Sequence, residues 1–161
     1  MERRHRKPHR LAVENYRGKK VYFVTIATAN RKPVFVSDKM VADHLKVLAS
    51  VSQKWAFDLM AYCYMPDHLH LLAAGTAQTS DLTSLIRDYK QATGYQYKQQ
   101  SGYPLWQKSF YDHILRRDEG IFAVARYILY NPVRKQMVER PADHPYSGSL
   151  VYGQAIFNSI G

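Results

Sequence analysis

The order of the predicted strands and helices indicates an α+β fold of the split βαβ type, a ferredoxin-like or RRM-like sandwich built on one antiparallel sheet. Strand-like runs of β-branched and aromatic residues alternate with stretches of helical apolar periodicity, and a Pro-Asp turn joins two consecutive strands. We expect two helices on one face of the sheet and an appended C-terminal helix. The predicted strands cover 20–28, 57–65, 68–74 and 110–115, and the predicted helices cover 38–55, 82–101 and 118–131.

The first half of the chain predicts a strand, a helix and a hairpin. The run KVYFVTIAT at 20–28 is rich in β-branched and aromatic residues, and Pro33 lies beyond its end. The next segment, 38–55, repeats apolar residues at helical spacing. FDLMAYCYM at 57–65 and HLHLLAA at 68–74 flank the Pro-Asp turn, so we expect them to pair with each other.

The second half predicts a helix, a strand and a last helix. Asp81 is a suitable N-cap for the second helix, and Gly102 marks the loop that follows it. FYDHIL at 110–115 is typical of a short edge strand. We expect Asp118 to cap the last helix and Pro132 to end it, because proline disfavours helical backbone at the residue before it.

Composition favours a nucleic-acid partner. The 161 residues carry 23 Lys and Arg against 13 Asp and Glu, a formal net charge of +10, and a basic excess of this size attracts polyanions. We expect a basic arm at 1–15 followed by a single domain at 16–161. No apolar run approaches the roughly 20 residues that span a bilayer, no signal peptide is evident, and the one cysteine excludes an internal disulfide. We therefore expect a cytoplasmic protein with no membrane partner.

The segment MPDHLH contains two histidines that alternate with a leucine. In a strand, His68 and His70 project from one face while Leu69 points to the other. Two imidazoles on one strand face can converge on a divalent ion if a third group approaches, but the pair is too small for a closed zinc site. A structural or incidental role for the pair is an equally open reading.

The last helix offers two further candidates. Tyr127 and Asn131 are four residues apart, so they share a face that differs from the apolar stripe at 121, 124, 125 and 128. A tyrosine in register with an amide suggests a nucleophile beside a metal ligand. Judged alone, Tyr127 could simply pack, and Asn131 before Pro132 could simply end the helix.

Taken together, these segments resemble a known family. YCYMPDHLHLL, LWQKSFYDHILR and RYILYNPV, with YRGKKVYFVTIATANRKPVF and HPYSGSLVYG, resemble the REP-associated tyrosine transposases, relatives of the single-tyrosine insertion-sequence transposases of the HUH superfamily. The resemblance extends from about Tyr16 to Gly153. Related insertion-sequence enzymes often carry glutamine where this chain has Asn131.

The resemblance implies a DNA nicking and joining enzyme. His68, His70 and Asn131 would hold Mg²⁺ or Mn²⁺ against a scissile phosphate in single-stranded DNA, and Tyr127 would form a 5′-phosphotyrosine. The substrate would be hairpin-containing, REP-like DNA. A 3′-OH could then reverse the step and join another end. Monomer and homodimer both remain open.

Basic residues supply candidate phosphate contacts, and His113 is a candidate substrate-near residue. The predicted DNA-binding residues are Arg3, Arg4, Arg6, Lys7, Arg10, Arg87, Lys90, Arg116 and Arg117. Two other functions remain open. A non-catalytic single-strand-binding module on an RRM-like sheet would give no covalent product. A metal-dependent phosphodiesterase using water would cut DNA without joining to it.

Overall fold

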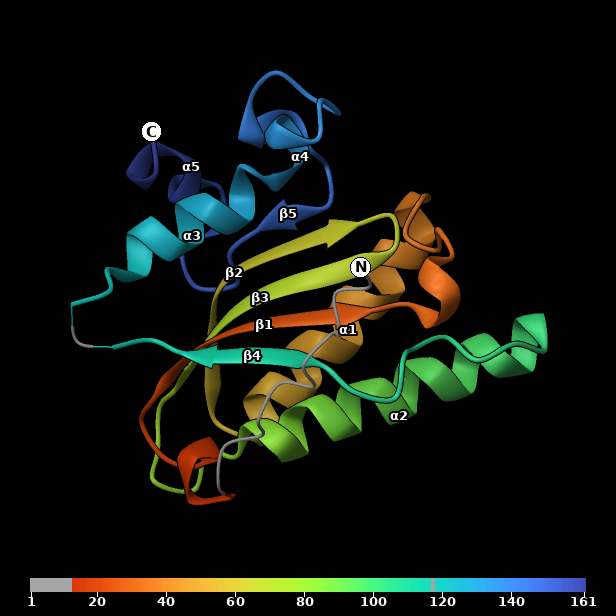
Figure 1. Ribbon diagram of the computed structural model, residues 1–161, viewed down its shortest axis with the longest axis horizontal. Coiled ribbons are helices and arrows are strands. Elements are labelled where there is room, and N and C mark those ends of the chain that lie inside the picture. Colours follow the sequence, from red (N-terminus) through yellow and green to blue (C-terminus); the bar gives the residue numbers. More distant parts are fainter. Residues whose placement is uncertain (1–12, 117) are drawn as a thin grey trace, which may run out of the picture.

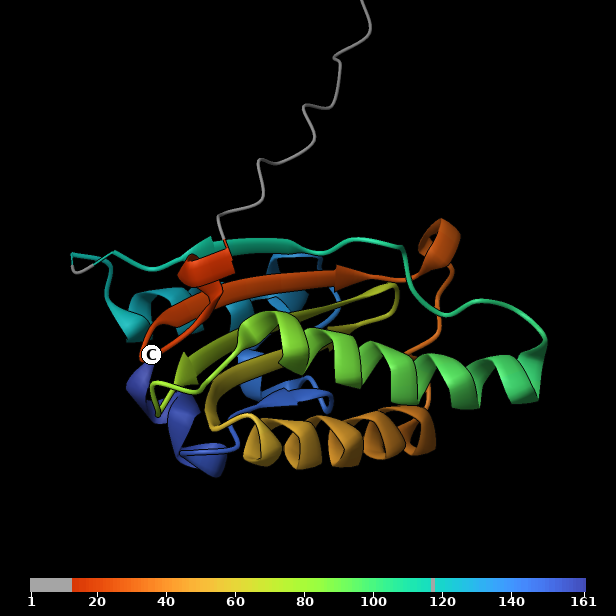
Figure 2. The same cartoon turned by 90° about the horizontal axis from the view of Figure 1, so that it is seen from below.

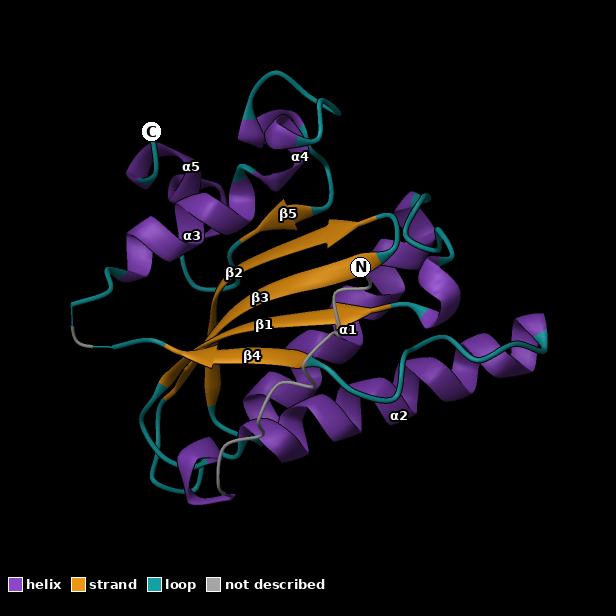
Figure 3. Cartoon of the chain, in the orientation of Figure 1, coloured by secondary structure: helices purple, strands orange, loops and turns teal. Residues whose placement is uncertain are grey.

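The computed structural model describes residues 13–116 and 118–161 and shows a five-stranded antiparallel sheet with the order β4–β1–β3–β2–β5 (Figures 1 and 3). The order of the first four strands is that of a split βαβ unit, so the predicted α+β fold is confirmed. The strands are β1 (Val21–Ala27), β2 (Phe57–Met65), β3 (His68–Gly75), β4 (Tyr111–Ile114) and β5 (Ser147–Gly148). The α-helices are α1 (Asp38–Lys54), α2 (Leu82–Ser101), α3 (Ile121–Leu129), α4 (Asn131–Arg134) and α5 (Ile156–Ser159).

Helices α1 and α2 cover one face of the sheet and lie side by side (Figure 2). The core between them and the sheet is built from alternate residues of the strands, including Leu69 and Leu71, which are fully buried. Asp81 caps α2 as predicted, because its Oδ1 accepts a hydrogen bond of 3.1 Å from the N–H of Ser84.

Helix α3 packs on the opposite face, against β2 and β3. Ala125, Ile128 and Leu129 are fully buried there, in a second core that includes Cys63 and Leu72. Because helices cover both faces of β2, this strand is apolar along nearly its whole length rather than alternating with polar residues. No helix in residues 13–116 or 118–161 is long and apolar enough to cross a bilayer.

The last helix begins and ends differently from the prediction. Gly120, not Asp118, is the N-cap residue of α3, which ends at Leu129. Pro132 does not terminate a helix but lies in the first turn of α4, where the missing N–H of proline has no helical partner to lose. Strand β5 was not predicted, because a two-residue strand carries no periodicity.

Part of the predicted basic arm lies outside the described residues, namely 1–12. The last three arm residues belong to the short 3₁₀ helix η1 (Val13–Tyr16). The Tyr22 hydroxyl on β1 donates to the Asn15 carbonyl at 2.9 Å, so this end of the arm is bound to the sheet.

Candidate active site

His68 and His70 lie on the central strand β3, on the face away from α1 and α2. Their side chains alternate with Leu69 and Leu71, which point into the opposite core, as the sequence predicts. The two Nε2 atoms are 3.1 Å apart. The sheet therefore brings two ring nitrogens to one point.

Each ring makes a hydrogen bond through its Nδ1. His68 Nδ1 is 2.7 Å from Asp67 Oδ1, and a carboxylate can only accept, so His68 donates and its Nε2 carries a lone pair. His70 Nδ1 is 2.8 Å from Thr25 Oγ1, which can accept in the same way. Both Nε2 atoms are then free to bind a cation.

Burial keeps both rings neutral. It lowers the pKa of His68, against the opposing effect of Asp67. It also lowers the pKa of His70 to about 3, with smaller contributions from His68 and the guanidinium of Arg134. Neutral imidazole is the form that binds metals. Two such rings near neutral pH therefore form a ready pair of ligands.

Asn131 is the third potential ligand. Its side chain is buried, and its Nδ2 lies 3.4 Å from His68 Nε2. Amide oxygen and nitrogen exchange places on a half-turn of the terminal bond, so the oxygen can face the same point. Residues 13–116 and 118–161 contain no cluster of three or more His, Cys, Asp and Glu side chains. The Asn131 amide is thus the side chain next to the histidine pair that could add a third protein ligand.

The donor set fits an octahedral divalent ion. In an octahedral complex, two neighbouring ligand atoms that each lie about 2.1 Å from the ion, at an angle of about 90° to each other, are roughly 3.0 Å apart. This is close to the 3.1 Å that separates the two Nε2 atoms. Two imidazoles and one amide leave coordination positions for water and a phosphate oxygen. Imidazole suits Mn²⁺ better than Mg²⁺.

Tyr127 lies on α3 at the edge of this face, and its side chain is 56% exposed. Its ring meets Phe23 edge-on with centroids 6.0 Å apart, and Phe23 stacks on His70 at 5.5 Å. The Arg134 guanidinium lies 4.2 Å above the Tyr127 ring. The chain thus places an exposed phenol one aromatic ring away from the histidine pair.

Comparison with known proteins identifies the family. The family described as "Transposase IS200 like" matches residues 18–131, well over half of the chain and all four candidate residues. The chain belongs to this family. It is a tyrosine transposase, and the enzymes of this class nick and join DNA.

Individual relatives confirm the resemblance to REP-associated tyrosine transposases. A Haemophilus influenzae protein assigned to that group is 28% identical over 143 residues, which cover 79% of this chain and 78% of the relative. The REP-associated tyrosine transposase of Escherichia coli K12 is 24% identical over 127 residues, covering 78% and 74%. The structure of a REP-associated tyrosine transposase bound to a REP hairpin has a TM-score of 0.69 at 24% identity, covering 82% of this chain and 78% of that one, and it shows the shared fold.

A second exposed tyrosine lies on the same face of the transposase. Tyr111 on β4 is 48% exposed, and its ring meets Phe23 with centroids 6.1 Å apart. It is paired across the sheet with Thr25, and it lacks the helical register with Asn131 that Tyr127 has. The geometry therefore favours Tyr127 but makes Tyr111 the control that any assignment needs.

The other predicted residues are not brought to the histidine pair. Arg87 and Lys90 lie on α2, across the sheet, where Arg87 binds Asp88 and Lys90 Nζ donates to the Gln107 carbonyl at 2.6 Å. His113 Nε2 lies 3.0 Å from both carboxylate oxygens of Glu119. Arg116 is exposed just beyond β4. The remaining predicted DNA-binding residues lie outside the described residues: Arg3, Arg4, Arg6, Lys7, Arg10 and Arg117.

Sequence reasoning missed the residues that support the histidines. Arg31 Nε binds Asp67 Oδ2 at 3.0 Å, and so holds the carboxylate that orients His68. Asn30 and Arg31 both have φ of +54°, a left-handed backbone that costs energy in residues other than glycine and is often found at functional sites. Thr25 is brought to His70 by strand register alone, from 45 residues away.

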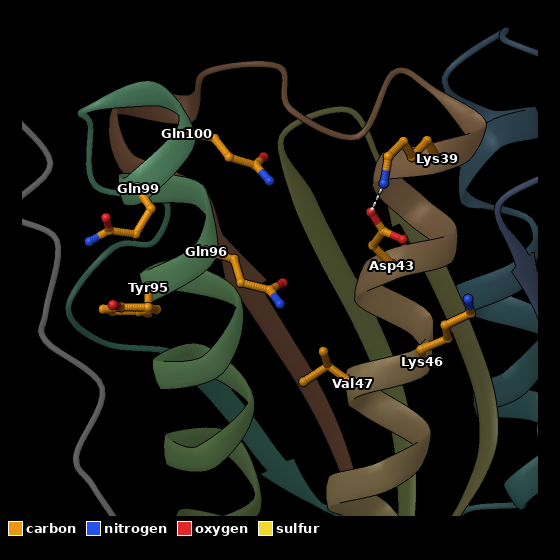
Figure 4. A pocket seen from close by; sticks show the side chains of 8 residues that line it. All are labelled: Lys39, Asp43, Lys46, Val47, Tyr95, Gln96, Gln99 and Gln100. Atoms are coloured by element: carbon orange, nitrogen blue, oxygen red, sulfur yellow. Dashed lines mark hydrogen bonds and ion pairs between the residues drawn. The ribbon is translucent and has the colours of Figure 1, made fainter.

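A groove of about 530 Å³ lies on the other side of the transposase, between α1 and α2 (Figure 4). Its lining is polar and includes the Lys39–Asp43 ion pair, Lys46 and three glutamines of α2. It contains no histidine, and the sheet separates it from the histidine pair. It is therefore not part of the candidate active site.

Proposed function

We propose that this transposase cleaves and rejoins single-stranded DNA, with Tyr127 as the nucleophile and a divalent ion held by His68, His70 and Asn131. The observation that carries the proposal is the approach of two imidazole Nε2 atoms to 3.1 Å beside a buried amide, with an exposed tyrosine on the same side of the sheet. When bound, the ion would polarise the scissile phosphate and offset its charge.

The Tyr127 oxygen attacks the phosphorus atom as its O–H proton leaves. A P–O bond to tyrosine forms, the bond from phosphorus to the 3′ oxygen breaks, and that oxygen leaves as a 3′-OH after taking a proton. The 5′-phosphotyrosine keeps the energy of the broken ester, so a 3′-OH can reverse the step on the same or another end. The cation of Arg134 lies over the ring, where it offsets negative charge that develops on the phenol.

We propose hairpin-containing DNA as the substrate. The support is the REP hairpin bound by the structural relative, together with the net charge of +10. We also propose Arg116, which is exposed just beyond β4, as a phosphate contact for the bound DNA. Arg117 and the basic arm are proposed contacts on sequence grounds alone.

The nucleophile is tested by trapping the covalent product. A labelled single-stranded hairpin oligonucleotide is incubated with Mn²⁺ and the wild-type protein, Tyr127→Phe or Tyr111→Phe, and then run on a denaturing gel. Tyr127→Phe should lose both cleavage and the protein–DNA adduct while single-strand affinity falls less than about tenfold, because it removes one exposed hydroxyl. Tyr111→Phe should keep the adduct, and EDTA should abolish it.

Each competing function would give a different set of products on the gel. Cleavage without any adduct would indicate a phosphodiesterase that uses water. Retarded DNA with neither product would indicate the non-catalytic binding module. Peptide mapping that places DNA on a tyrosine other than Tyr127 would refute the assignment.

A further inference from the structure

A hollow of about 370 Å³ lies on the outer side of α3, next to Tyr127. Its lining comes from α3, the end of α4 and the residue between the two helices: Ala123, Arg126, Tyr127, Tyr130 and Arg134. We propose that this hollow binds one unpaired nucleotide of the DNA strand, adjacent to the cleaved phosphate. The inference rests on the proposed function, since it takes Tyr127 to be where the strand is cut.

Two arginines give the hollow its charge. Arg126 Nη1 donates to the Ile160 carbonyl, and Arg134 Nη2 donates to the Tyr127 carbonyl, each at 2.6 Å. Neither guanidinium forms an ion pair with a carboxylate of residues 13–116 or 118–161, whereas Arg31 and Arg87 both do. A guanidinium has five N–H donors in a planar fork that matches a phosphate. Two cations held in place without a described counter-ion favour an anionic ligand.

The same side chains provide stacking surfaces. The Arg126 guanidinium lies 4.5 Å above the Tyr130 ring, and the Arg134 guanidinium lies 4.2 Å above the Tyr127 ring. Unpaired bases stack on aromatic rings and on guanidinium planes, at about 1–3 kcal/mol per base. The hollow thus combines the two features that recognise a single-stranded nucleotide, and its volume is at the small end of those of ligand sites.

Tyr127 connects the hollow to the candidate active site. Its ring contacts Phe23, which stacks on His70. Tyr127 is also one of the residues that line the hollow. A strand whose phosphate reaches the Tyr127 hydroxyl must continue past this residue. The hollow is therefore where the next nucleotide of that strand can lie.

The surface continues beyond the hollow toward the start of α3. Phe122 and Tyr152 pack with ring centroids 5.7 Å apart, and they are 43% and 40% exposed. Exposed aromatic pairs at the end of a cationic hollow extend the track available to unpaired bases.

The experiment measures binding in EDTA, so that no cleavage occurs. Fluorescence anisotropy is recorded for a series of labelled single-stranded oligonucleotides, each with one neutral methylphosphonate linkage near the cleavage position. The proteins are the wild type, Arg126→Gln and Lys46→Gln. Lys46→Gln is the matched control, because it removes one positive charge from α1, in the groove of Figure 4 across the sheet.

Arg126→Gln should weaken binding of the unmodified strand about 5- to 20-fold, the loss of one or two charge-assisted hydrogen bonds on an exposed surface. At one linkage, within two nucleotides of the cleavage position, the methylphosphonate should weaken binding of the wild type but not of Arg126→Gln. Lys46→Gln should keep the wild-type pattern. An Arg126→Gln protein that is still penalised by the methylphosphonate at every linkage would overturn the proposal.

A folding defect is separated from lost recognition by a second variant. Arg126 also binds the Ile160 carbonyl, so thermal unfolding is compared for Arg126→Gln and Arg126→Lys. Arg126→Lys keeps the charge but not the planar fork, and it should restore sensitivity to the methylphosphonate at the same linkage. If Arg126→Lys restores thermal stability without that sensitivity, the hollow does not bind the phosphate.

Failure of this inference would leave the cleavage assay unaffected. If no methylphosphonate linkage affects the wild type and Arg126→Gln differently, while the Tyr127 adduct still forms, only the nucleotide site is refuted. The expected pattern without any adduct refutes only the proposed chemistry.

Discussion

Thr25→Val tests whether the orientation of His70 determines metal binding. Valine has the shape of threonine and suits a strand, so the substitution keeps the packing of β1 and removes only the hydroxyl. That hydroxyl lies 2.8 Å from His70 Nδ1, and it can accept from Nδ1–H in the tautomer whose Nε2 carries the lone pair. Without it, Nδ1–H has no acceptor, and the ring can move its proton to Nε2, where it blocks the ligand position.

The size of the effect follows from that lost acceptor. Leaving a partly buried donor unsatisfied costs about 1–3 kcal/mol, and each 1.4 kcal/mol is about a tenfold change in a binding constant. The metal-binding tautomer should therefore be disfavoured by roughly 5- to 150-fold, a range that overlaps the 10–100-fold typical of residues that orient metal ligands. Stability should fall by less than this cost, because the ring without a metal can move its proton to Nε2 and so leave no donor unsatisfied at Nδ1.

The assay is a titration of cleavage with Mn²⁺, together with direct Mn²⁺ binding by calorimetry. Thr76→Val is the matched control, because its hydroxyl also makes a hydrogen bond, of 2.9 Å to the Ala56 carbonyl, just beyond the other end of β3. Thr25→Val should need at least about fivefold more Mn²⁺ for half-maximal cleavage, and Thr76→Val should not. Equal Mn²⁺ requirements in the two variants would refute the reasoning.

Two further predictions concern stability and the basic arm. His44 is buried on α1, and burial lowers its pKa from 6.5. Its Nδ1 lies 2.8 Å from the Met40 carbonyl, and its Nε2 has no hydrogen-bond partner. The folded state thus binds a proton at His44 less readily than the unfolded state, so the free energy of unfolding should fall as the pH drops below 6.5. Urea titrations should show a smaller fall for His44→Leu than for the wild type. Equal falls in the two proteins would contradict this prediction. Deleting residues 1–10 should lower single-strand affinity and flatten its log–log salt dependence by roughly 0.7 per lost phosphate contact; an unchanged slope would show that the arm makes none.

Local sequence patterns predicted the elements and half of the site. The alternation in HLHLLAA determined which face the two histidines share, because side chains of a strand alternate irrespective of what the strand pairs with. The four-residue spacing of Tyr127 and Asn131 predicts that they share one face of a helix, whereas the structure has them in two successive helices, with Asn131 buried and Tyr127 exposed. That Asn131 lies 3.4 Å from His68 depends on the packing of α3 against β3, which the apolar stripe of α3 indicated only in outline.

The residues that orient the ligands could not be read from sequence. Thr25 reaches His70 through the pairing of β1 with β3, and no local signal gives the register of strands that are not joined by a short turn. Asp67 adjoins His68, but its role depends on Arg31, which is positioned by a left-handed backbone that sequence rules assign to glycine. Both are tertiary effects that act on locally ordinary residues.

The interruption between α3 and α4 explains how Arg134 comes to lie over Tyr127. In one continuous helix, residues seven positions apart are separated by about 10.5 Å along the axis. Helix α3 ends at Leu129, and Tyr130 separates it from α4. The carbonyls of the last turn of a helix lack intrahelical donors and accept hydrogen bonds from other groups. Arg134 Nη2 supplies one to the Tyr127 carbonyl at 2.6 Å, and this bond holds the guanidinium 4.2 Å above the Tyr127 ring. The break between the two helices therefore lets one side chain, Arg134, both cap a carbonyl of α3 and hold its cation over the ring of the proposed nucleophile.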